Sequence, residues 1–135
     1  MTQSRQRFDP AVVRAAALHL EAFASANAGV LLTVLTSSDG FEIAAHPADS
    51  ARTARIAAMS SSIQALSEAI AREAGLSGNR SLIVETDTGT VLVLGLAESS
   101  LQMSLAVVAT DSELLGKLLW ASRNLCRELQ SSLRQ

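Results

Sequence analysis

The chain is poor in the residue types that build disulfide frameworks, aromatic pockets and membrane spans. Its 135 residues include one cysteine, one tryptophan, three phenylalanines and no tyrosine. The lone Cys126 excludes an internal disulfide and a zinc cluster, and the scarcity of aromatics argues against an aromatic-lined ligand pocket. No apolar run approaches the ~20 residues of a membrane-spanning helix, so we expect no membrane insertion.

An excess of charge of one sign is also missing, because 11 basic residues face 13 acidic ones and the formal net charge is −2. This balance gives no electrostatic footprint for nucleic acid. Met1 to Arg7 are polar and lack the apolar stretch typical of a signal peptide. We therefore expect a cytoplasmic protein, and the preference for arginine over lysine together with 23 alanines fits a GC-rich bacterial genome.

The hydrophobic fraction of 48% at this length predicts one domain with its own core. We expect residues 1–8 to form a flexible tail and residues 9–135 to form the domain. Asp9 and Pro10 fit the N-cap and first turn of a helix, and Asn27 to Gly29 fit its end. An Asp-Gly hairpin turn then joins two strands, and the three segments are Val30 to Thr36, the turn Ser37 to Gly40, and Phe41 to His46.

A long amphipathic helix is predicted from Ala51 to Ala74, ahead of Gly75 and Gly78. At ~100° per residue its large apolar side chains fall in one narrow arc, which we expect to pack on the chain's own sheet. The members of this arc are Ile56, Met59, Ile63, Leu66 and Ile70.

Three further strands are predicted at Ser81 to Thr86, Thr90 to Leu96 and Leu101 to Ala109. The last two carry apolar residues on both faces, which is typical of central strands. Thr110 and Glu113 match a capping box at the start of a leucine-rich final helix. The order α-β-β-α-β-β-β-α predicts an α+β fold, with a five-stranded antiparallel sheet that carries the long helix on one face and the two terminal helices on the other.

Three stretches of the sequence resemble the roadblock/LC7 family. They are Gly29 to Leu35 running into Ser38-Asp39-Gly40, the helix from Arg55 to Ala74, and Ser81 to Glu85 with Thr90 to Leu96. The resemblance implies a homodimer paired through the long helix and the strand after it, so that two sheets join into one. It also implies a non-enzymatic platform for a small Ras-like GTPase. Such a platform acts on the GTPase without supplying an arginine finger.

The residues give separate support for pairing. The helix arc opposite the large apolar side chains is small and nearly uncharged, which would let a second helix approach closely. High helix propensity alone explains the alanines of this arc but not its serines. An open strand edge invites aggregation, so we expect it to be covered as well. The predicted dimer interface comprises Ala54, Ala58, Ser61, Ser62, Ala65, Ala69, Arg72, Ser81, Ile83 and Glu85.

No residue set for catalysis, a cofactor or a metal emerges from the sequence. His19 and His46 have no further ligand at metal spacing, and Cys126 fits a buried, inert position on an apolar helix face. Turn chemistry accounts for Ser37 to Asp39. No phosphate-binding glycine motif is present, so any dependence on a nucleotide would come from a partner.

Trp120 lies away from the apolar face of the last helix, beside Arg123 and Arg127. A tryptophan flanked by arginines is typical of an interface anchor, which makes these three residues candidate partner contacts. The alternative, which we favour slightly, is that Trp120 packs against the first helix or Phe8. Four arginines that bracket the long helix fit solvated charge better than an arginine finger, and these are Arg52, Arg55, Arg72 and Arg80.

The sequence thus predicts a homodimeric, non-enzymatic regulator or scaffold that binds a Ras-like GTPase and biases its nucleotide state. The alternative is a small sensory domain of similar α+β architecture that binds a ligand beside the sheet. The few aromatics and the absence of an ionisable cluster count against this alternative.

Overall fold

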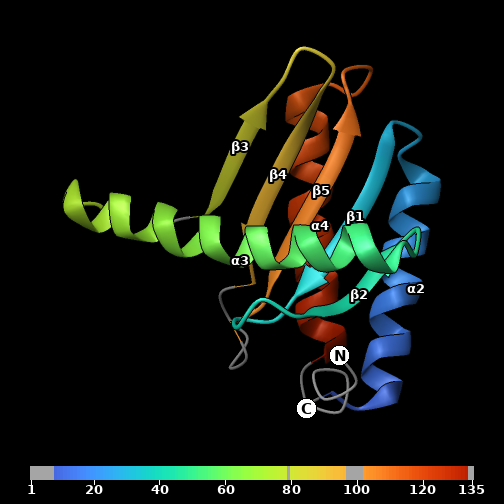
Figure 1. The fold of residues 1–135 in the computed structure, drawn as a ribbon. Helices are drawn as coiled ribbons and strands as arrows, with labels where there is room; N and C mark the ends of the chain where they lie inside the picture. The colour runs from blue at the N-terminus through green and yellow to red at the C-terminus, as the bar shows by residue number, and fades with distance from the viewer. Residues whose placement is uncertain (1–7, 79, 97–101, 134–135) are drawn as a thin grey trace.

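The computed structural model describes residues 8–78, 80–96 and 102–133 (Figure 1). Its elements follow the predicted order. They are α2 (Pro10–Ala26), β1 (Val30–Thr36), β2 (Glu42–His46), α3 (Ser50–Glu73), β3 (Ser81–Glu85), β4 (Gly89–Gly95), β5 (Ser104–Thr110) and α4 (Leu115–Leu133).

The five strands form one sheet in the order β2-β1-β5-β4-β3, and every neighbouring pair is antiparallel. β5 lies at the centre and β4 beside it, which confirms that the two strands with apolar residues on both faces are internal. β2 and β3 are the edge strands. The edge position predicted for Ser81 to Glu85 is therefore confirmed.

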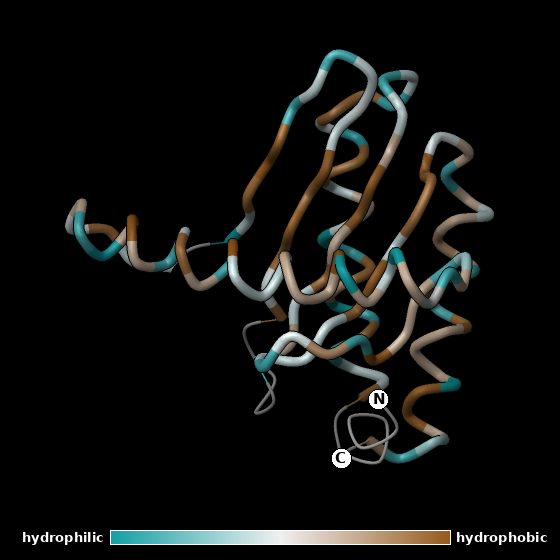
Figure 2. The backbone as a smooth tube through the Cα atoms, viewed as in Figure 1, coloured by the Kyte–Doolittle hydropathy of each residue, from teal (hydrophilic) through white to brown (hydrophobic). Residues whose placement is uncertain are grey.

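The sheet lies between two helical layers. Figure 1 shows α3 crossing one face, with α2 and α4 on the other, as the sequence predicts. The main core fills the space between the sheet and the α2/α4 layer, where Leu20, Leu35, Leu105 and Leu129 are fully buried. Figure 2 shows the corresponding hydrophobic segments concentrated in the strands. A much smaller cluster, centred on Val34 and Ala57, lies beneath α3.

The start of α2 follows its local sequence closely. The Asp9 carboxylate accepts a hydrogen bond from the Ala11 backbone N–H at 2.9 Å, and Pro10 occupies the first turn. Asn27 ends the helix. Phe8 packs against the main core, so the prediction of a tail extending to residue 8 is wrong at that position, and the predicted tail residues 1–7 lie outside the described residues.

The start of α4 differs from the prediction. The helix begins at Leu115 rather than after Thr110, and the Glu113 carboxylate accepts a hydrogen bond from the Gly29 backbone N–H at 2.9 Å. β5 extends through Thr110, whose hydroxyl lies 2.6 Å from that of Ser112. The predicted capping box is therefore wrong, because Glu113 satisfies a buried donor in the α2–β1 loop instead of capping its own helix.

Two glycines offer a matched test of backbone packing. A Cβ at Gly89 would overlap the carbonyl oxygen of Ala109 on the neighbouring strand, whereas a Cβ at Gly116 on α4 meets nothing within 4 Å. We expect Gly89→Ala to destabilise the protein by about 1–3 kcal/mol through strand displacement. Gly116→Ala should stabilise it by about 0.5–1 kcal/mol through helix propensity. Urea unfolding measures both, and equal stability of the two variants would contradict this packing.

Candidate functional site

The long helix α3 rests on its own sheet through small and polar side chains. Thr53, Ala57 and Ser60 are buried beneath it. The Thr53 hydroxyl lies 2.5 Å from the Glu42 carboxylate and 2.9 Å from the Asp49 carbonyl oxygen, which holds the first turn of α3 against β2. Little apolar area is buried by such residues, so their contribution to holding the helix is small.

The large apolar side chains of α3 point away from this contact. Met59, Leu66 and Ile70 are 60%, 61% and 62% exposed, while Ile56 and Ile63 are half-buried. We call these five residues the apolar flank. The prediction that they pack on the chain's own sheet is wrong for the three exposed ones.

The reason for this orientation is the shape of the sheet surface under α3. Ala57 packs with Val34 and Ala106, so short side chains meet at the closest approach. Further along the helix, Gln64 lies over Gly95, where a Cβ would come within 2.9 Å of the Gln64 side-chain nitrogen. Bulky residues on that side would lift the helix off the sheet, and they therefore occupy the neighbouring flank.

The apolar flank extends past the edge of the sheet. The 24 residues of α3 span about 36 Å, whereas five strands span only about 19 Å between their outer axes. Figure 1 shows the C-terminal part of α3 projecting beyond β3. Exposed apolar side chains that cluster in this way mark interaction sites on soluble proteins.

The outer edge of β3 adjoins the projecting part of α3. The Thr86 backbone N–H donates to the Gly89 carbonyl at 2.9 Å, which makes this pair the hydrogen-bonded end of the β3–β4 hairpin. Bonding alternates from there along the antiparallel register. Ser81, Ile83 and Glu85 consequently direct their backbone N–H and C=O groups outward, away from β4.

The predicted interface residues divide between two sides of α3: Ala58 and Ser62 lie beside the apolar flank, whereas Ser61 and Ala65 lie on the opposite flank. Ser61 is half-buried and donates to the Ser38 carbonyl at 2.9 Å. Ser81 is also half-buried, while Ile83 and Glu85 are exposed on β3. Contact of all these residues with a second chain stays a prediction. The remaining predicted residues are exposed on α3, and they are Ala54, Ala58, Ser62, Ala65, Ala69 and Arg72.

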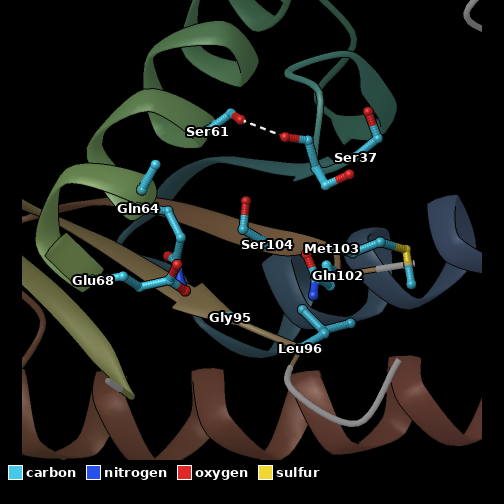
Figure 3. A pocket seen from close by; sticks show the side chains of 11 residues that line it. Ser37, Ser61, Gln64, Glu68, Gly95, Leu96, Gln102, Met103 and Ser104 are labelled. Carbon is cyan, nitrogen blue, oxygen red and sulfur yellow. Dashed lines mark hydrogen bonds between the residues drawn. The ribbon is translucent and has the colours of Figure 1, made fainter. Parts of the chain in front are cut away.

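A pocket of about 350 Å³ opens on the other flank of α3 (Figure 3). Gln64 and Glu68 of α3 lie on one side of it, with Ser104 and Gly95 of the sheet beneath. The β1–β2 turn closes one end, where the Ser37 hydroxyl lies 2.6 Å from the Asp39 carboxylate. This contact confirms the turn role predicted for Ser37 and Asp39.

The candidate chemical residues stay apart from one another. Within the described ranges, no three His, Cys, Asp or Glu side chains come close enough to hold a metal ion. His19 lies 3.9 Å from a Glu128 carboxylate oxygen, and the Arg52 guanidinium lies 3.7 Å from Asp49. No helix in the described part of the chain has the length and apolar character needed to cross a bilayer.

Cys126 is buried on the core side of α4, as the sequence predicts. Burial raises the pKa of its thiol to about 12, and the nearby Arg127 charge offsets this only in part. The reactive thiolate is therefore scarce at neutral pH. We expect slow modification of Cys126 by a thiol reagent in native protein and rapid modification in urea. Fast labelling of the native protein would contradict this burial.

Trp120 is 66% exposed on the outer face of α4. The favoured prediction, that it packs against α2 or Phe8, is wrong. Leu118, Leu125 and Leu129 already fill the contact between α4 and the core, so the tryptophan is left outside. Arg123 and Arg127 are exposed on the same helix.

These features define a class of protein: a small α+β domain whose five-stranded sheet carries one long, partly unsupported helix on one face. The sequence profile of the Roadblock/LC7 domain matches residues 16–109, and the chain belongs to this family. The family resemblance noted in the sequence is thereby confirmed. A search of curated protein sequences finds no match.

Solved structures share the fold at low sequence identity. A Roadblock/LC7 domain from Streptomyces avermitilis is 21% identical with a TM-score of 0.79, over 87% of this chain and 96% of that one. The gliding protein MglB from Thermus thermophilus is 17% identical with a TM-score of 0.79, over 93% of each chain. MglB in a tetrameric arrangement is 18% identical with a TM-score of 0.81, again over 93% of each.

Proposed function

We propose that two copies of this chain pair through the apolar flank of α3 and the outer edge of β3. A second sheet joined at β3 would lie beneath the projecting part of α3 and give it the support that its own sheet lacks. The partner's α3 would lie along the apolar flank and cover Met59, Leu66 and Ile70. The exposure of these three side chains is the observation that carries the proposal.

In this arrangement the small residues of the predicted interface contribute less to the contact than the apolar flank does. Ala58 and Ser62 line a shallow hollow together with the flank residues Met59, Ile63 and Leu66. A side chain from a partner helix would fit this hollow. The small residues then lie at the rim of the contact, and the apolar flank forms its centre.

The paired chains act as a non-enzymatic platform for a Ras-like GTPase and bias its nucleotide state. Membership of the Roadblock/LC7 family supports this role, as does the structural likeness to the gliding protein MglB. The sequence has no phosphate-binding glycine motif, so the nucleotide belongs to the partner. Such a platform shifts the equilibrium between two states only by its difference in affinity for them.

The GTPase role is tested by binding. The Ras-like GTPase encoded nearest to this gene, loaded in turn with GDP and a non-hydrolysable GTP analogue, is titrated into the protein in a calorimeter. We expect one form to bind at least about tenfold more tightly, a difference of about 1.4 kcal/mol. Equal affinity for both forms, or absence of binding to either, would reject the regulatory role.

A second candidate function is binding of a small polar ligand in the pocket beside α3. Its volume of about 350 Å³ lies at the lower end of known ligand sites, and its lining of serine, glutamine and glutamate side chains suits hydroxyl or amine groups. Native mass spectrometry of gently purified protein tests this function, because a retained ligand adds its mass to the chain.

A further inference from the structure

The outer face of α4 carries three cations around the only tryptophan of the chain. We call Lys117, Trp120, Arg123 and Arg127 the basic face. Their spacing of three, three and four residues places all four within an arc of about 120° on the helix. Each of them is exposed, so the face presents positive charge together with one large apolar side chain.

The positive charge of this face is not neutralised by neighbours. Among the described residues, no carboxylate lies within 4.0 Å of Lys117, Arg123 or Arg127. Arg127 donates to the side-chain oxygen of Asn124 at 2.9 Å, which orients its guanidinium along the face. The nearest acidic residue in sequence, Glu128, is turned toward His19 of α2. A local excess of positive charge thus occurs on a chain whose net charge is −2.

We propose that the basic face docks an acidic segment of another protein, with an apolar side chain of that segment seated on Trp120. Tryptophan and arginine are the residues most enriched at the energetic centres of protein interfaces. Arginine also binds carboxylates in a two-pronged geometry that lysine cannot match. The four residues therefore combine an apolar anchor with carboxylate recognition.

Other anionic partners fit the face less well. Helices that lie on membranes insert a continuous apolar face, but the main apolar face of α4, which includes Leu118 and Leu125, is buried in the core. Binding to nucleic acid rests on many phosphate contacts, and this face offers three cations. Within the basic face, Trp120 is the one apolar side chain.

This docking surface is separate from the proposed dimer interface. α4 lies on the face of the sheet opposite α3 (Figure 1), so the two surfaces do not overlap. A variant that cannot dimerise should retain the basic face. Docking at the basic face can therefore be disproved while pairing is confirmed, and pairing can be disproved while docking is confirmed.

Because Trp120 is the single tryptophan of the chain, its fluorescence reports binding at the basic face directly. The probe is a synthetic peptide of glutamates flanking one leucine, and the matched controls replace the glutamates by lysines or the leucine by serine. We expect the glutamate–leucine peptide to shift Trp120 emission to shorter wavelength as water leaves the indole. Added salt should weaken this response, since the charges are exposed. An equal response to the lysine peptide would overturn the proposal.

Charge reversal identifies the residues involved. Arg123→Glu and Arg127→Glu should each weaken binding of the glutamate–leucine peptide at least about tenfold, whereas Arg14→Glu, exposed on α2, should leave it unchanged. Trp120→Ala should weaken it roughly 30-fold, read from the anisotropy of a labelled peptide. Equal losses in all the arginine variants would overturn the proposal. So would an emission shift with phosphatidylglycerol vesicles but none with the peptide, because the surface would then recognise a membrane.

Discussion

Leu66→Glu is expected to convert the protein from a dimer into a monomer. Leu66 is 61% exposed at the middle of the apolar flank. Burying one leucine side chain contributes about 1.5–3 kcal/mol, and a two-fold interface contains two copies. The loss of about 3–6 kcal/mol corresponds to a rise in the dimer dissociation constant of about 150-fold to 20,000-fold. Size-exclusion chromatography with light scattering measures the change directly.

The matched control is Leu18→Glu. Leu18 is 65% exposed on α2, on the opposite side of the sheet, so this substitution introduces the same charge at nearly the same exposure. It should leave the dimer intact. Ala65→Arg, on the opposite flank of α3 where Ala65 lines the pocket, should weaken pairing less than Leu66→Glu does. A monomeric wild type, or equal effects of the two leucine variants, would reject the apolar flank as the interface.

Ile83→Pro is expected to weaken the dimer at the strand edge while leaving the chain folded. The backbone N–H of Ile83 points outward from β3, so proline removes a donor that a partner strand would use and none that β4 uses. A net hydrogen bond contributes about 0.5–1.5 kcal/mol, and two copies are lost. The dissociation constant should rise roughly 5-fold to 150-fold, measured by analytical ultracentrifugation.

Val84→Pro provides the contrast. Val84 is the next residue of β3, and its N–H bonds to β4 in the antiparallel register. Proline there should lower the melting temperature of the chain itself, because it breaks the ladder within one sheet. If Ile83→Pro lowered the melting temperature as much as Val84→Pro, the outward direction of the Ile83 backbone would be wrong.

The local elements could be predicted from the sequence because their signals are local. The branched run Val30 to Thr36 matches β1 at both ends, and Asp9 with Pro10 sets the start of α2. For β5 the sequence predicts a start at Leu101, which lies outside the described residues, and the strand itself starts at Ser104. The apolar residues on both faces of β4 and β5 predict internal strands, because helices cover both sides of the sheet.

The direction of a helix face could not be predicted in the same way. Periodicity shows that Met59, Leu66 and Ile70 share one arc, but not which surface that arc meets. The answer depends on Gly95 and Ala106, which belong to strands far along the chain and become neighbours of α3 only in the folded sheet. Glu113 illustrates the same limit, because its partner Gly29 lies 84 residues away.

The proposed pairing through α3 would also make the stability of each chain depend on its concentration. In the proposed dimer, Met59, Leu66 and Ile70 are buried only by the partner, so part of the folding free energy would arrive only on association. Dilution would then loosen α3 before it loosens the α2/α4 core. Synthesis at low abundance would leave newly made chains open to proteases along this one helix, and accumulation would protect them.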